Sequence, residues 1–287
     1  MIEVQHVPLL AEQKRIYAIP RGPGRFQDYI ATITRGPEVC VAPLVAMNPM
    51  AREHVARAVD ELLAIDAEEV AKAAVDEANA RLSGVPLDHR LKLGLVVLDD
   101  LRGGWTDRRY IEMGYRLKTA DGRPNATDAI LKYGWLSGGL WVTEPMTPDA
   151  VRRSVLGSIY QFAHHLRMNL PLTLREMFQL EGRTAVFSGA LGPRLDPDDL
   201  AYSREVIASW LDSDDVPRQF ACLFGDAAAR SVGYEPLGLT ARAGLAVAID
   251  EARRSGESPE AALEAPGKAQ PFPASVPQAA WMSAPPE

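Results

Sequence analysis

Much of this chain repeats one pattern, in which a residue able to cap a helix is followed by apolar residues at helical spacing. Each such segment predicts a helix that buries one face. The segments are 48–63, 66–82, 147–166, the stretches that begin at Thr173, Asp196 and Asp215, and an alanine-rich stretch at about 240–254. One-sided helices need something to cover, so we expect them to share a core with other elements.

Three shorter segments have the pattern of β-strands. Residues 91–98 form an apolar run rich in branched side chains, which predicts a buried strand. Residues 111–118 alternate between apolar and polar, which predicts a strand with one face in water. Residues 133–143 predict a third strand, and whether it breaks at Gly138 and Gly139 is left open. Together these segments predict a small sheet.

The two ends of the chain have a different composition from its middle. Residues 1–47 mix short apolar runs with Pro and Gly, which favours an arm or short strands joined by turns. From residue 257 the composition turns to Pro, Ala, Ser and Glu, which predicts a disordered tail over 257–287. We therefore expect a single α+β domain over residues 1–256, predominantly helical with a sheet of about three strands, followed by that tail.

Composition and charge argue against several classes of protein. No apolar run approaches the roughly 18 residues that a membrane span needs. The first residues also lack a secretory signal, so we expect a cytoplasmic protein. The net charge is −7 and basic residues come only in pairs, whereas nucleic-acid binding needs a basic stripe. Cys40 and Cys222 lie far apart and outside any CxxC pair, which disfavours a disulfide framework and a structural zinc site.

The main candidate site is a loop rich in acids and arginines, directly after the predicted strand at 91–98. The standard phosphate-loop, dinucleotide, zincin and serine-hydrolase motifs are absent. Ligands often bind beyond strand ends, where adjacent glycines expose backbone N–H groups to an anion. We assign Asp99 and Asp100 as candidate bases or cation ligands. The candidate substrate-binding residues are Arg102, Gly103, Gly104, Trp105, Arg108 and Arg109. The alternative is a plain turn whose arginines pair with acids at the surface.

A few polar and aromatic residues outside this loop are second-tier candidates. Glu181 falls on the apolar side of its predicted helix and would act there as a proton acceptor or metal ligand, unless the helix ends first and leaves it in solvent. His165 flanks an apolar face as a candidate base or ligand, although a hydrogen-bonded structural histidine is the commoner outcome. His54, near a helix start, is expected in solvent. Trp135 and Trp141 favour core packing over stacking on a ligand.

These features favour a cytoplasmic enzyme that acts on a small polar, anionic metabolite, with arginines as substrate clamps and the reaction type left open. The alternative is a non-catalytic assembly or adaptor protein that engages a protein partner or a second copy of itself. Its helical surface and the tail residues Phe272, Trp281 and Met282 would make that contact. A third hypothesis is a metal-dependent protein, although the sequence assigns neither a metal nor a cofactor.

Overall fold

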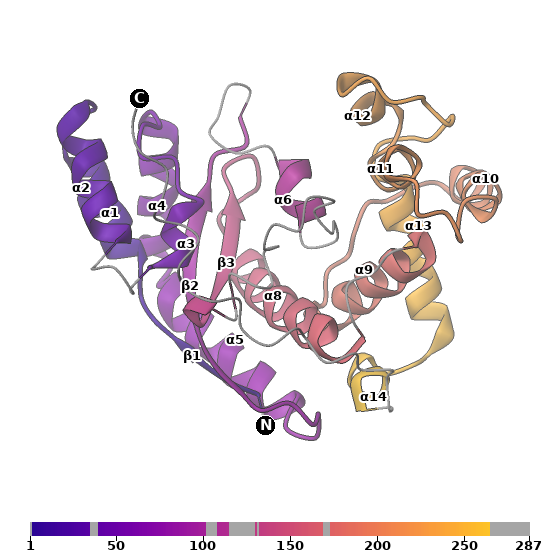
Figure 1. Ribbon diagram of the computed structural model, residues 1–287, viewed down its shortest axis with the longest axis horizontal. Helices are drawn as coiled ribbons and strands as arrows, with labels where there is room; N and C mark the ends of the chain where they lie inside the picture. The colour runs from indigo at the N-terminus through magenta and orange to yellow at the C-terminus, as the bar shows by residue number, and fades with distance from the viewer. Residues whose placement is uncertain are drawn as a thin grey trace, which may run out of the picture.

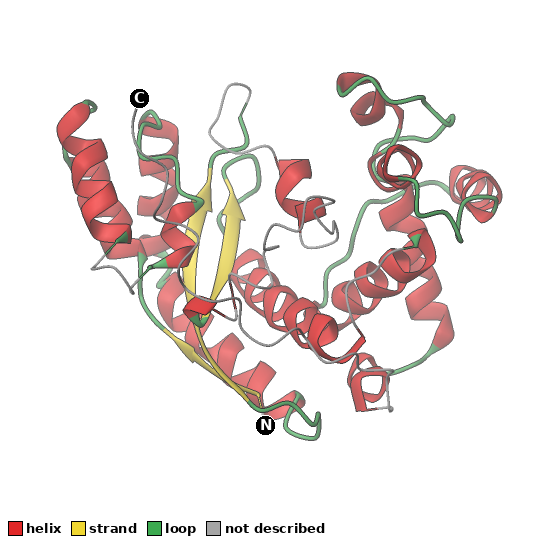
Figure 2. Cartoon of the chain, viewed as in Figure 1, coloured by secondary structure: helices red, strands yellow, loops and turns green. Residues whose placement is uncertain are grey.

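The structure is a computed structural model that describes residues 2–34, 40–101, 108–114, 130, 132–168 and 173–264. Its centre is a parallel sheet of three strands, β1 (Ile2–His6), β2 (His89–Leu98) and β3 (Trp135–Trp141), in the order β1-β2-β3. The register pairs Ile2 with His89 at one end, and Leu98 with Trp141 at the other. Figure 2 shows this sheet surrounded by helices. The predicted α+β class, predominantly helical with a small sheet, is confirmed.

Helices cover both sides of the sheet. α5 and α8 pack on each other and contact β1 and β3, whereas α1, α3 and α4 lie on the opposite side (Figure 1). The helices of this part are α1 (Leu10–Ala18), α2 (Pro23–Ile33), α3 (Ala42–Val45), α4 (Glu53–Ala64), α5 (Ala67–Arg81), α6 (Arg108–Gly114) and α8 (Pro148–Met168). The remaining helices are α9 (Leu174–Ser188), α10 (Pro197–Ala208), α11 (Val216–Phe224), α12 (Asp226–Ser231), α13 (Ala243–Ser255) and α14 (Pro259–Glu264).

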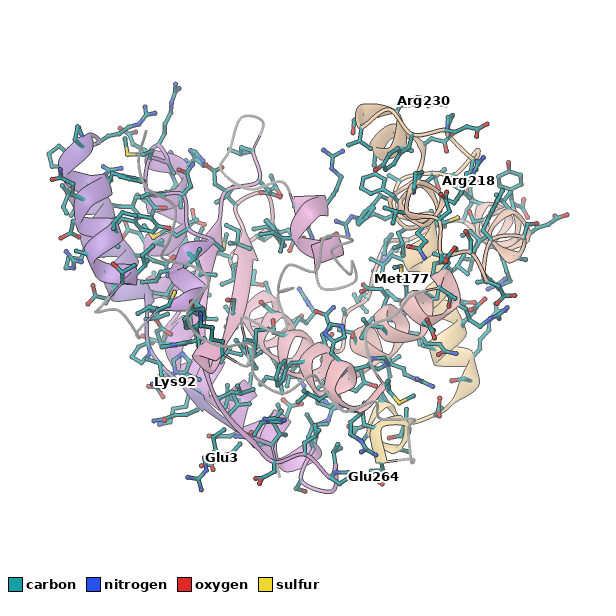
Figure 3. The ribbon with its side chains drawn as sticks, in the orientation of Figure 1. Glu3, Lys92, Met177, Arg218, Arg230 and Glu264 are labelled. Carbon is teal, nitrogen blue, oxygen red and sulfur yellow. The ribbon has the colours of Figure 1, made fainter. Side chains whose placement is uncertain are left out.

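Apolar side chains form two clusters. The first fills the space between the sheet and the helices around it, and the second lies among α9, α10, α11 and α13. Figure 3 shows Lys92 with the sheet, and Met177 among the helices of the second cluster. Among the described helices, none has both the length and the apolar character needed to cross a lipid bilayer.

Two side-chain amides complete hydrogen bonding where the short sheet lacks a neighbouring strand. Asn79 donates to the carbonyl of Val4 (2.8 Å) and accepts from its N–H (2.9 Å), on the outer edge of β1. β1 stops before the second half of β2, and there Gln13 takes the place of a strand. Its Nε2 donates to Leu95 O (2.9 Å), and its Oε1 accepts from Val97 N (3.0 Å). These four backbone groups of β1 and β2 therefore have partners without a further strand.

Most helices predicted from caps are present. Thr173 forms a capping box with Glu176, while Asp196 and Asp215 cap α10 and α11 through their side chains. These motifs act through hydrogen bonds between near neighbours in sequence, which is why they can be recognised without knowing the fold.

The prediction of strands or an arm within residues 1–47 is wrong for much of that range. β1 is a strand, but 10–18 and 23–33 are the helices α1 and α2. The buried positions of α1 include Gln13, whose polarity hides the helical stripe in the sequence. Pro23 is the first residue of α2, where its fixed φ favours the helix, so this proline marks a helix start instead of a turn between strands.

The strand predicted at 111–118 is also wrong. Residues 108–114 form α6, and residues 115–118 lie outside the described part of the chain. An i,i+4 ion pair between Arg108 and Glu112 (2.8 Å) stabilises the helical turn. A short alternation of apolar and polar residues does not exclude a helix when such a pair forms.

Two boundaries from the sequence analysis are resolved. β3 pairs with β2 continuously from Trp135 to Trp141, so the strand does not break at its glycine pair. Trp135 and Trp141 are both buried, which confirms core packing. Residues 259–264 form α14, with Leu263 fully buried, so the predicted tail does not begin at 257. Residues 265–287, with Phe272, Trp281 and Met282, lie outside the described residues.

Candidate active site

Asp99 follows the last residue of β2 and is almost completely buried, with 2% of its surface exposed. Asn48 Nδ2 donates a hydrogen bond to its Oδ2 (2.9 Å), and His54 Nε2 lies 3.0 Å from its Oδ1. Tyr17 donates its hydroxyl hydrogen to the carbonyl of Asn48 (2.8 Å) and so holds this segment. A buried carboxylate held in this way fixes the orientation of the imidazole ring.

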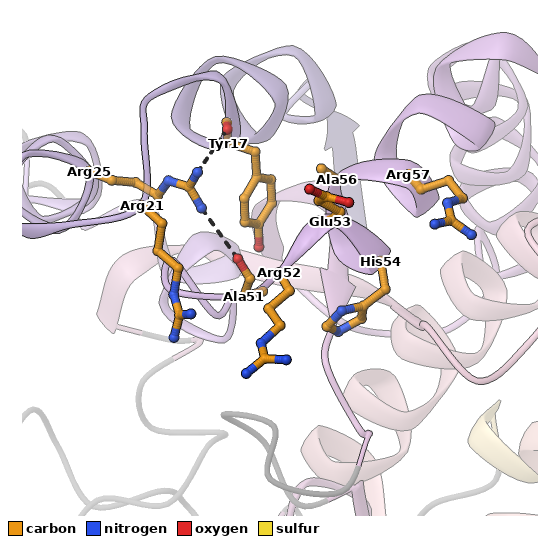
Figure 4. A pocket seen from close by; sticks show the side chains of 9 residues that line it. All are labelled: Tyr17, Arg21, Arg25, Ala51, Arg52, Glu53, His54, Ala56 and Arg57. Carbon is orange, nitrogen blue, oxygen red and sulfur yellow. Dashed lines mark hydrogen bonds between the residues drawn. The ribbon is translucent and has the colours of Figure 1, made fainter.

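His54 connects this buried carboxylate to a surface cavity. The cavity has a volume of about 640 Å³, and Figure 4 shows the side chains around it. It is lined by Tyr17, Arg21, Arg25, Ala51, Arg52, Glu53, His54, Ala56 and Arg57. The His54 side chain is 32% exposed and bonded to Asp99, so its predicted place in open solvent is wrong. Asp99 is 45 positions away in sequence, and no local pattern links the two.

The cavity is strongly cationic. Arg25 is buried and donates to the carbonyls of Tyr17 (3.1 Å) and Ala51 (3.3 Å), so it joins the end of α1 to the segment before α4. Arg21, Arg52 and Arg57 are exposed, and within the described ranges none of them forms an ion pair. In Figure 4, Arg21 and Arg52 extend in the same direction from two different segments. Cations that are not neutralised by the protein are available to an anionic ligand.

Asp100 and Arg108 are engaged in a network beside this site. Asp100 accepts hydrogen bonds from the Thr143 hydroxyl (2.6 Å) and backbone N–H (3.3 Å), which ties the ends of β2 and β3 together. Arg108 pairs with Glu112 (2.8 Å) and Glu144 (2.5 Å) and lies over the ring of Trp141. Neither residue lines the cavity.

The other residues of the predicted loop are also placed away from the cavity or are not described. Arg109 donates to the Ser231 hydroxyl (2.5 Å) in α12 and does not line the cavity. The remaining four candidates, Arg102, Gly103, Gly104 and Trp105, lie outside the described residues. Among the loop candidates, Asp99 contacts a residue that lines the cavity, namely His54.

Glu181 and His165 lie in α9 and α8, and neither lines the cavity. His165 is fully buried beside His164, with the two ring centroids 6.4 Å apart. Burial, and then the charge of Arg183, lowers the pKa of His164 to about 4, so its imidazole is neutral at pH 7. In the part of the chain that is described, no group of three or more His, Cys, Asp or Glu side chains is arranged to hold a metal ion.

The geometry brings together a histidine, its buried carboxylate partner and several arginines around one cavity. The imidazole can exchange a proton with a bound molecule, and the arginines can hold that molecule by an anionic group. Asp99 is the one feature of this site that the sequence analysis singled out. No family model, curated protein or solved structure matches the chain.

Proposed function

We propose that this protein is an enzyme that binds a small anionic metabolite in the cavity beside His54 and transfers a proton through that imidazole. The observation that carries the proposal is that two features line the same cavity. One is His54, which is hydrogen-bonded to the buried carboxylate of Asp99. The other is a set of exposed arginines that form no ion pair among the described residues, namely Arg21, Arg52 and Arg57. The cavity volume of about 640 Å³ falls within the range of metabolite sites.

In this proposal each residue has a separate role. The arginines bind and orient the substrate through its negative charge. His54 takes or gives the proton, while Asp99 positions the imidazole through its hydrogen bond to Nε2. Asn48 in turn fixes the Asp99 carboxylate. Arg108 and Arg109 have other partners and are assigned no contact with the substrate.

A ligand screen tests this proposal. Thermal unfolding of the full chain is measured against a panel of anionic and neutral metabolites, and mass spectrometry then follows the hits for product. We expect anionic hits whose stabilisation is lost in Arg52→Gln, because binding to the folded state raises the unfolding temperature. His54→Gln should keep the binding and lose turnover.

Arg194→Gln is the matched control, since Arg194 is exposed and lies outside the cavity. It should behave like the unmodified protein in binding and in turnover. The proposal fails if no anionic compound gives a stabilisation that depends on Arg52. The catalytic part fails on its own if His54→Gln turns over a hit at the unmodified rate.

A further inference from the structure

The charge around the cavity indicates which anionic group it takes. Four arginines line it, against Glu53 as the single acid among the lining residues. The Asp99 carboxylate is buried behind His54 and is already shared with that ring and with Asn48. A monocarboxylate would bring only one negative charge to this excess of positive charge. A phosphate monoester carries about −1.5 to −2 at pH 7 and matches it better.

The placement of the arginines supports the same group. Arg21 follows α1 and Arg52 directly precedes α4, yet their guanidinium groups extend in the same direction in Figure 4. Each planar fork can bind two oxygen atoms. A carboxylate offers two oxygens, which one such fork can engage together, whereas a phosphoryl group offers three terminal oxygens and so gives a second fork an oxygen of its own.

The start of α4 adds a further electrostatic contribution. Arg52 is the N-cap residue of this helix of 12 residues, and no side chain caps its first N–H groups. Ala51, Arg52, Glu53 and His54, which surround this helix start, all line the cavity. The positive end of the helix dipole therefore acts on the same space as the arginines and favours an anion there.

We infer that the cavity is a phosphoryl-binding site and that the substrate is a small phosphate monoester. This inference rests on the proposed function and specifies its substrate class. Nε2 of His54 is held by Asp99, and among the described residues none bonds to Nδ1. Nδ1 is therefore the atom that exchanges a proton with the bound phosphate ester.

Calorimetric titration of the full chain at pH 8 with inorganic phosphate, sulfate, acetate and succinate tests the inference. Phosphate and sulfate, both tetrahedral dianions, should bind at least about tenfold more tightly than acetate. Arg21→Gln and Arg52→Gln should each weaken phosphate binding about tenfold, as expected for the loss of a charge-assisted hydrogen bond. Arg194→Gln should leave it unchanged, and circular dichroism should show that all the variants are folded.

The possible results separate this inference from the broader proposal. If succinate binds with the same dependence on Arg21 and Arg52 while phosphate and sulfate do not bind, the phosphoryl assignment is overturned and a site for an anionic metabolite stands. If phosphate binds equally well to all the variants, it binds elsewhere and the assignment is overturned. If no anion binds in a way that depends on these arginines, both proposals fall.

Discussion

A single buried amide, Gln13, replaces part of a missing strand at the edge of β2. Its side chain is fully buried in α1 and bonds both Leu95 O and Val97 N. The residue is therefore required for its two hydrogen bonds to the sheet as well as for its volume. A buried backbone group that loses its partner costs about 1–3 kcal/mol.

The first prediction concerns Gln13→Met, which keeps the length of the side chain and removes both hydrogen-bonding groups. We expect the free energy of unfolding to fall by about 3 kcal/mol, because Leu95 O and Val97 N are left without partners. Urea unfolding measures this change. Gln27→Met, at an exposed position of α2, should change it by less than about 0.5 kcal/mol. Equal effects at the two positions would show that the amide does not complete the sheet.

His164 gives a residue-scale prediction for pH. Its pKa is lowered to about 4 by burial and by Arg183, whereas an unfolded histidine titrates near pH 6.5. As the pH falls from about 6.5 to 4, the unfolded chain binds this proton and the folded chain does not, so stability falls by about 3 kcal/mol. His164→Leu removes that contribution. Unfolding followed from pH 7.5 to 4.5 should therefore show the variant gaining stability relative to the unmodified protein, and parallel profiles would contradict the assignment.

At the scale of elements, the close approach of α9 and α13 depends on Gly182. A Cβ atom at this position would lie 2.3 Å from the carbonyl oxygen of Ala248 and 2.8 Å from the Cβ of Ala252. Both contacts are with a neighbouring helix, and the nearer one is with backbone, which cannot move as a flexible side chain would. Gly157 in α8 differs, since a Cβ there would meet nothing closer than Thr184 Cγ2 at 3.6 Å.

The paired variants Gly182→Ala and Gly157→Ala should therefore have opposite effects on stability. Alanine is the better helix former in both helices, by roughly 1 kcal/mol. At Gly157 we expect a gain of about 0.5–1 kcal/mol in the free energy of unfolding. At Gly182 the overlap with α13 should outweigh this gain and give a net loss of about 1–3 kcal/mol. Guanidinium unfolding of both variants tests the pair, and a gain at both positions would rule out a tight helix contact.

The elements that could be predicted from sequence are those fixed by local interactions. The Thr173 capping box and the Asp196 cap join residues three positions apart, so their patterns are visible in the chain itself. α1 was missed because its buried face includes Gln13, whose partners in β2 lie more than 80 positions away. The strand assigned to 111–118 failed because Arg242 and Arg108 stabilise Glu112 within a helix, and Arg242 comes from a distant segment.

The candidate site shows the same limit. Asp99 could be singled out because it follows a recognisable buried strand. Its partner His54 and the cavity residues Arg21 and Arg52 come from the region before that strand, and nothing local marks them as neighbours. Only the packing of α1 and α4 beside β2 brings them to one cavity.

At the scale of the whole molecule, α6 connects the part built around the sheet to the second helical cluster. Glu112 in α6 binds both Arg108 (2.8 Å) and Arg242 (2.9 Å), and Arg242 immediately precedes α13. The Arg109 contact with Ser231 makes a second connection, to α12, which packs on α11 of that cluster. Since the two apolar clusters are separate, we expect these polar contacts to contribute to the cohesion between them.

The last prediction is that Glu112→Gln weakens this connection in a pH-dependent way. Burial alone would raise the pKa of Glu112, but the charges of Arg242 and Arg108 outweigh burial and lower it. The stabilisation is therefore present above the unfolded pKa of about 4.3 and is lost as the pH falls through the lower folded value.

At pH 7 the Glu112→Gln variant should lose about 2 kcal/mol of unfolding free energy, since the Glu112 side chain is only 20% exposed. Near pH 3 the difference should be smaller than at pH 7 in urea titrations. Glu235→Gln removes an ion pair with Arg218 whose acid is 71% exposed, and it should change stability by less than about 0.5 kcal/mol at either pH. A loss in Glu112→Gln that is the same at both pH values would mean that the carboxylate charge does not hold α6 to the second cluster.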